Sequence, residues 1–191
     1  MNKIDGAAGA VPTGRSYAGG KFYDRRRIIK LASNSFNKEK YPLAIDYCRT
    51  AVNSGNGQKE LVADAYYIWC MSCLKLNKPR DARKVCYDAR LKLGNYLDLI
   101  YFEIRIASLT GELDKIPRFA ENYLELYYHA GAQFDPSREK TSEKIGEVLL
   151  LAGQVLEQKQ EKAGAVDYYS KYLSIFPDDE PLRERVTELA P

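Results

Sequence analysis

The sequence predicts an all-α fold of about four helix-turn-helix pairs and a C-terminal capping helix. Apolar residues recur at helical spacing from Phe22 onward, and no run of useful length alternates with the period of two that marks a strand. Glycine and proline mark the joints between the periodic runs, as at Gly94, Gly111 and Pro177. In addition, one spacing of small residues recurs in several pairs, which indicates an internal repeat.

Residues 1–21 precede the periodic part, and we predict that they form a disordered lead-in. They are rich in glycine and alanine and have few large apolar side chains, so burying them could not offset the entropy lost on ordering. Residues 9–16, GAVPTGRS, superficially match a phosphate-binding loop, but no buried strand precedes them and no helix opens directly after them. Residues 22–191 are the predicted helical repeat domain, and a chain of 191 residues fits one domain.

The periodic part divides into helices in a regular order. The first pair spans residues 22–36 and 41–52, the second 61–76 and 81–93, the third 97–109 and 113–128, and the fourth lies within 146–177. Asp178 and Asp179 precede Pro181. Acidic groups are stabilising at the positive end of a helix, and proline is common in the first turn. These three residues therefore predict a ninth helix over 182–189. This helix should cover the apolar face that a terminal repeat would otherwise expose.

A spacing of twelve and then seven residues relates the pairs to one another. The matching positions are Ala32, Ala44 and Ala51; Cys70, Ala82 and Ala89; and Gly153, Ala165 and Tyr172. The third pair keeps the spacing with the larger residues Ile104, Ile116 and Tyr123. Its two helices are therefore expected to lie farther apart or to cross at a different angle, and its membership of the repeat is the least secure.

This pattern resembles the tetratricopeptide repeat, a helix-turn-helix unit of about 34 residues. The resemblance covers about residues 22–177 and is strongest in the fourth pair, GEVLLLAGQVLEQKQEKAGAVDYYSKYLSIFP. It implies that the pairs stack into a right-handed superhelical solenoid whose concave face binds an extended peptide or a helix. The run AVDYYSKYLSIFPDD also resembles the helical repeat region of some bacterial family-two glycosyltransferases. That likeness implies at most an accessory role, because the chain has no Asp-any-Asp motif.

The resemblance also implies which side chains line the groove, since the first helix of each pair faces it. The residues chosen on this basis are Ile29, Phe36, Tyr67, Met71, Leu74, Tyr101 and Arg105. Aromatic and arginine side chains commonly dominate binding energy, so Tyr67 and Tyr101 are the expected anchors. The alternative is that both tyrosines pack between neighbouring helices. The repeat subclass that clamps a terminal carboxylate has lysine and asparagine on this surface. This chain has Ser33, Tyr67 and Met71 at those positions, so we do not expect it to bind a terminal carboxylate in that way.

Composition and charge do not favour nucleic acid or a membrane as the partner. The net charge is only +3, and no apolar run approaches the roughly 18 residues of a spanning helix. The N-terminal region lacks the apolar core of a secretory signal, so a cytoplasmic location is expected. A basic cluster on the first helix could contact phosphate or an acidic peptide. We interpret it as a solvated face because few aromatic residues accompany it. Its members are Lys21, Arg25, Arg26, Arg27 and Lys30.

Four cysteines raise the question of a metal or redox site. Cys70 and Cys73 form a Cys-any-any-Cys pair, and Cys48 could approach them because a second helix packs beside the first helix of the next pair. However, Cys70 occupies the small-residue place of its pair, and Cys48 and Cys86 lie four residues after a small residue of a second helix. We therefore interpret the cysteines as reduced core residues, with metal binding as the alternative.

No active site is recognised in the sequence, and no cofactor is predicted. His129 is the only histidine, so no site that needs a second histidine can be built. We therefore expect a non-enzymatic scaffold or adaptor that binds a partner protein in its concave groove. Two alternatives remain: an accessory helical domain of a glycosyltransferase system, and a cysteine-ligated metal protein. The sequence does not specify the partner, the pathway or the oligomeric state.

Overall fold

The computed structural model describes residues 24–54, 58–129 and 142–190. All regular structure within these ranges is helical, which confirms the all-α prediction. The helices are α1 (Arg25–Asn37), α2 (Tyr41–Asn53), α3 (Lys59–Lys75), α4 (Pro79–Leu93), α5 (Leu97–Thr110), α6 (Ile116–His129), α7 (Ser142–Gln158), α8 (Lys162–Ile175) and α9 (Glu180–Leu189). A short 3-10 turn, η1 (Leu113–Lys115), leads into α6. The predicted lead-in, residues 1–21, lies outside the described ranges.

Several helices begin at the residues that the sequence provides for this purpose. Asp24 and Asp179 cap α1 and α9, since their carboxylates accept hydrogen bonds from the backbone N–H groups of Arg26 and Leu182 at 3.1 and 3.2 Å. Proline stands in the first turn of α2, α4 and α9, where its missing N–H costs nothing. As a result α9 begins at Glu180, two residues before the predicted start.

The turn inside each helix pair has the same geometry in all four pairs. One residue has a positive φ in each: Glu39 at 58°, Asn77 at 55°, Gly111 at 73° and Gln160 at 63°. The next backbone N–H donates to the carbonyl five positions earlier, from Lys40 to Ser35, Lys78 to Cys73, Glu112 to Ala107 and Glu161 to Leu156, each at 2.9 Å. This is a Schellman motif, which satisfies the last carbonyl groups of a helix. The third pair therefore shares the turn of the other three.

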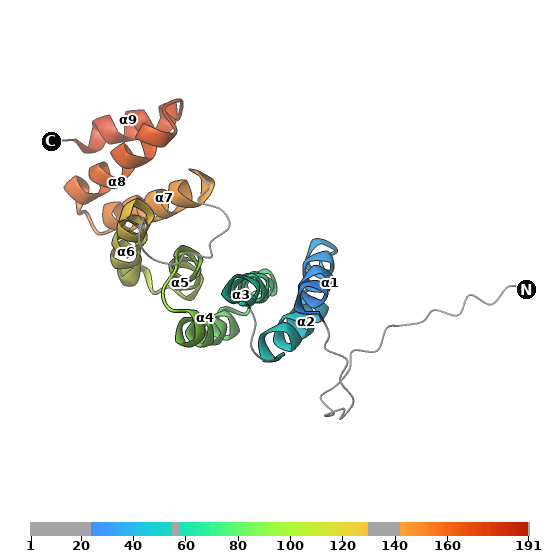
Figure 1. Ribbon diagram of the computed structural model, residues 1–191. Coiled ribbons are helices and arrows are strands. Elements are labelled where there is room, and N and C mark those ends of the chain that lie inside the picture. The colour runs from blue at the N-terminus through green and yellow to red at the C-terminus, as the bar shows by residue number, and fades with distance from the viewer. Residues whose placement is uncertain (1–23, 55–57, 130–141, 191) are drawn as a thin grey trace, which may run out of the picture.

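The helices pack in chain order. Each helix from α1 to α8 contacts the next one, and the first helix of each pair also contacts the first helix of the following pair: α1 with α3, α3 with α5, and α5 with α7. Figure 1 shows the helices following one another along a curved path from α1, in blue, to α9, in red. One set of helices, α1, α3, α5 and α7, thus forms a continuous row.

The twelve-and-seven positions lie where the helices of a pair meet. Their alanines are fully buried, and so are Ile104 and Ile116 in the third pair. Helices α7 and α8 approach closely at Gly153, where an added Cβ would lie 2.4 Å from Cε1 of Tyr169. Only glycine fits this position without displacing the ring, so the small residue is required by packing.

The apolar core consists of three clusters that follow the chain. The first joins α1, α2 and α3; the second surrounds Cys70 between α2 and α5; the third extends from α5 to α9. The last helix contributes to the third cluster through Leu189, which is 6% exposed, and through the half-buried Leu182 and Val186. It covers the end of the preceding pair, as a capping helix should.

Candidate partner-binding groove

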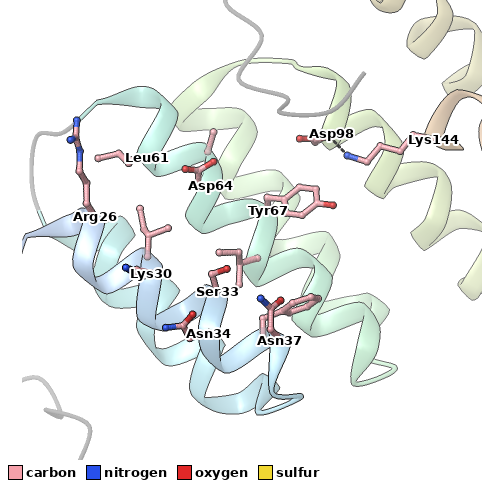
Figure 2. Close-up of a pocket in the computed structure, with 14 residues that line it drawn as sticks. Arg26, Lys30, Ser33, Asn34, Asn37, Leu61, Asp64, Tyr67, Asp98 and Lys144 are labelled. Atoms are coloured by element: carbon pink, nitrogen blue, oxygen red, sulfur yellow. Dashed lines mark hydrogen bonds and ion pairs between the residues drawn. The ribbon is translucent and has the colours of Figure 1, made fainter. Parts of the chain in front are cut away.

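A cavity of about 830 Å³ opens between α1 and α3 and reaches residues of α5 and α7. Figure 2 shows its lining side chains. All of them come from the first helices of the pairs, because the lining belongs to α1, α3, α5 and α7. The volume lies within the range of ligand-binding pockets.

Helix α1 forms one wall of the cavity with two adjacent rows of side chains. Residues three and four positions apart lie on the same face of a helix, so each row extends along the axis. The first row contains Ile29, Ser33 and Phe36, and the second contains Lys30, Asn34 and Asn37. The α1 wall therefore combines apolar side chains with amide, hydroxyl and ammonium groups. Across it, Leu61, Asp64 and Tyr67 of α3 form the facing wall (Figure 2).

A buried ion pair lies at the end of the cavity near α5 and α7. Nζ of Lys144 is 2.9 Å from Oδ1 of Asp98, and the two side chains are only 11% and 7% exposed. The ammonium also lies 4.9 Å from the ring centre of Tyr67 and 5.8 Å from that of Tyr101, within cation–π range. Lys144, on α7, thus neutralises Asp98 of α5 and also contacts Tyr67 of α3.

The predicted basic cluster divides into side chains with different roles. Arg25 is 8% exposed, and its Nε donates to the carbonyl of Ala51 at 2.9 Å and to Oγ of Ser54 at 3.2 Å, so it ties α1 to the end of α2. By contrast, the exposed Arg26 and Lys30 line the cavity. Lys21, another member of the cluster, lies outside the described residues. The rim of the cavity is therefore cationic at the α1 side.

Three of the seven predicted groove residues, Ile29, Phe36 and Tyr67, line this cavity. Tyr67 also packs against Phe102 of α5, with ring centres 5.4 Å apart. Met71 and Leu74 lie farther along α3, half-buried against the core cluster around Cys70. The structure thus brings together the N-terminal part of the predicted set and separates the rest from the cavity.

The remaining two predicted residues bind a side chain of the protein itself. The hydroxyl of Tyr101 donates to Oε2 of Glu147 at 2.5 Å, and Arg105 forms an ion pair with the same carboxylate. Burial raises the pKa of Tyr101, which keeps its hydroxyl protonated as a donor. These contacts join α5 to α7, so Tyr101 and Arg105 link the third pair to the fourth.

A second cavity, of about 460 Å³, lies between α7 and the end of α8. Its lining includes Leu150 and Gln154 of α7, together with Tyr172 and Phe176. Glu147 also borders it, although this carboxylate already binds Arg105. The two cavities therefore lie towards opposite ends of the row formed by α1, α3, α5 and α7.

Three polar residues of the 830 Å³ cavity were not predicted from the sequence: Asn34, Asn37 and Lys144. The two asparagines follow the basic Lys30 at intervals of four and three residues, and this helical spacing was the signal that could have identified them. Lys144 had no such signal, because its position depends on how α7 packs beside α5.

The four cysteines are all buried and free. Burial raises the pKa of Cys48 to about 12 and that of Cys73 to about 11, so both remain thiols at neutral pH. Among the residues that the structure describes, no group of three or more histidine, cysteine or acidic side chains is arranged to hold a metal ion.

No protein-family model matches the chain, and no curated protein matches it in sequence. In the described part of the chain, no helix has both the length and the apolar character needed to cross a bilayer.

Proposed function

We propose that this chain is a tetratricopeptide-like solenoid scaffold that acts by non-covalent recognition of a partner protein. Its concave groove, formed by α1, α3, α5 and α7, would hold a peptide or helix of that partner. The proposal depends on one observation, which is the set of helices that supply the residues lining the cavity. Every lining residue belongs to the first helix of a pair, which is the side that a solenoid of helix pairs presents as its inner face.

The repeated turn supports the solenoid part of the proposal. All four pairs end their first helix with the same Schellman motif, and each first helix contacts the next first helix. Units that repeat both their internal turn and their contact with the neighbour generate a regular array. Such an array would present one continuous inner surface formed by the first helices, and the origin of the cavity lining in these helices supports this position for the groove.

The chemistry of the cavity favours a polypeptide as the ligand. Asn34 and Asn37 each offer an amide that can donate and accept, which matches the alternating N–H and C=O groups of a peptide backbone. Ile29, Phe36 and Tyr67 provide apolar contact area beside them. A partner would thus be bound by backbone hydrogen bonds and by apolar side chains together, without a chemical step.

Site-specific photo-crosslinking in the native host tests this proposal. A photoreactive phenylalanine analogue at Asn34, which is exposed and lines the cavity, should capture a partner polypeptide. The matched control places the same analogue at Tyr87, which is 64% exposed on α4, outside the cavity lining. Equal capture from both positions, or none from Asn34, would contradict the proposal.

Binding of the captured partner can then be measured with groove variants. The double variant Tyr67→Ala and Tyr101→Ala should weaken binding by roughly 2 kcal/mol or more, because Tyr67 lines the cavity and Tyr101 holds α5 beside α7 through Glu147. Because Tyr101 also binds Glu147, the double variant should melt at a lower temperature. Ser33→Trp separates the two effects, since Ser33 lines the cavity and its substitution fills that space while leaving Glu147 bonded. It should abolish binding without lowering the melting temperature.

A further inference from the structure

Two of the buried cysteines are in direct sulfur contact. Sγ of Cys70, on α3, lies 3.4 Å from Sγ of Cys86, on α4, and the residues are 1% and 2% exposed. The thiol of Cys70 also donates to the backbone carbonyl of Ala82 at 3.8 Å. Cys48 and Cys73 are buried close by, but neither makes a sulfur–sulfur contact of this kind. The structure therefore selects one pair from the four cysteines.

This pair differs from the one that the sequence motif suggests. Cys70 and Cys73 are three residues apart on the same helix, where Cβ atoms lie about 5 to 6 Å apart. A disulfide needs Cβ atoms about 3.5 to 4.5 Å apart, so closing the motif would require α3 to unwind. Cys70 and Cys86 face each other from two helices of one hairpin. Their sulfur atoms need to approach by only about 1.4 Å to reach bonding distance.

We propose that Cys70 and Cys86 form an intramolecular disulfide that ties α3 to α4 when the chain folds in the presence of a small disulfide such as oxidised glutathione. A thiolate of one cysteine attacks oxidised glutathione, forms a mixed disulfide and releases one glutathione. The second cysteine then attacks the protein sulfur of the mixed disulfide and releases the second glutathione. Two protein thiols are oxidised, one glutathione disulfide is reduced, and the two thiol protons pass to the leaving glutathione thiolates.

The bond forms during folding rather than after it. In the folded, reduced protein both sulfur atoms are excluded from solvent, and burial raises the pKa of Cys70 well above its ordinary value. The thiolate that must attack is therefore scarce and inaccessible once the core has closed. While the hairpin is still forming, the thiols are exposed, and the pairing of α3 with α4 brings these two together.

Oxidative refolding tests this inference. Reduced, denatured chain is refolded with reduced and oxidised glutathione, trapped with an alkylating agent and digested with trypsin, which separates residues 60–75 from residues 85–90. We expect these two peptides to be linked in the wild type. They should also be linked in the double variant Cys48→Ser and Cys73→Ser, where Cys70 is the only cysteine left in residues 60–75. The oxidised protein should melt about 6 to 12 °C above the reduced protein, because the bond closes a loop of about 15 residues.

Other linkages overturn the inference. A bond between Cys70 and Cys73, a bond that includes Cys48, a disulfide between two chains, or helical protein with four free thiols would each do so. The variant Cys86→Ala should refold without any link to residues 60–75, and alanine preserves a small apolar side chain at this buried place. Even if that variant fails to fold, the wild-type and double-variant peptide maps decide the question.

Discussion

The substitution Gly153→Ala tests the contact between α7 and α8, because two effects of opposite sign act there. Alanine is favoured over glycine inside a helix by about 0.5 to 1 kcal/mol, so propensity alone predicts a more stable protein. The added Cβ, however, would lie 2.4 Å from Cε1 and 2.7 Å from Cδ1 of Tyr169. That ring is 2% exposed, and its hydroxyl donates to Oε2 of Glu157 at 2.8 Å. Burial and this hydrogen bond both oppose a shift of the ring.

The steric effect should prevail. Overpacking a well-packed site costs about 1 to 3 kcal/mol, which exceeds the gain in helix propensity. We therefore expect Gly153→Ala to lower the free energy of unfolding by about 1 kcal/mol and the melting temperature by about 2 to 4 °C. Urea unfolding followed by circular dichroism measures the first quantity.

Gly164→Ala provides the matched control on the facing helix. The three heavy atoms nearest its added Cβ would all belong to the side chain of Leu156; Cδ1, at 3.1 Å, is the nearest, and it is the far end of a flexible side chain. This variant should be neutral or slightly more stable than the wild type. If Gly153→Ala were stabilised as much as Gly164→Ala, the close approach of α7 and α8 would be refuted.

The other predictions concern stability, pH and the thiols. Ala165 is fully buried between α7 and α8, so Ala165→Leu should cost about 1 to 3 kcal/mol in urea unfolding; a neutral result would mean that the predicted register is wrong. Gln160→Gly should stabilise by about 0.5 to 1 kcal/mol because glycine tolerates the left-handed backbone, whereas Gly111→Ala at the matching turn should destabilise by a similar amount. Hydrogen bonds from Lys115, and then from neighbouring groups, lower the pKa of Glu112 from 4.5 to about 2. Because the pKa is lower in the folded state, this stabilisation is present above pH 4.5 and is lost as the pH falls towards 2. The melting temperature of Glu112→Gln should therefore depend less on pH between 4.5 and 2 than that of the wild type. Thiol titration should find most cysteines protected until the protein unfolds, and a stoichiometric metal in the purified chain would contradict their interpretation as core residues.

The helices and their register could be predicted because both depend on local sequence. Apolar spacing placed most helix ends within a few residues, since each first helix must turn its apolar stripe towards the second. The small residues at Ala44, Ala82 and Ala165 indicated where the backbones approach, and all three are fully buried. The size of the side chain at a helix contact depends on one residue alone, so it can be read directly from the sequence.

The turns and the cross-pair contacts could not be predicted in this way. Glu39 and Gln160 adopt a left-handed backbone, although residues with long side chains disfavour it. They do so because the Schellman hydrogen bonds and the packing of both flanking helices require it. Gly111 and Asn77, at the matching places of two other pairs, are of residue types that often adopt this conformation and were the visible signs. Likewise, Glu147 binds Tyr101 and Arg105 from 46 and 42 residues away, a pairing that follows from how α7 lies beside α5.

The surroundings of the side chains change along the row of first helices, α1, α3, α5 and α7. Between α1 and α3 its side chains surround a cavity, whereas between α5 and α7 Tyr101 and Arg105 are already bonded to Glu147. A partner entering the cavity displaces solvent, but a partner competing for Arg105 must first break an ion pair of the protein. In the proposed scaffold, binding energy would therefore come from the α1 and α3 side chains. The side chains of α5 and α7 would instead hold the third and fourth pairs together and so preserve the shape of the surface that the partner meets.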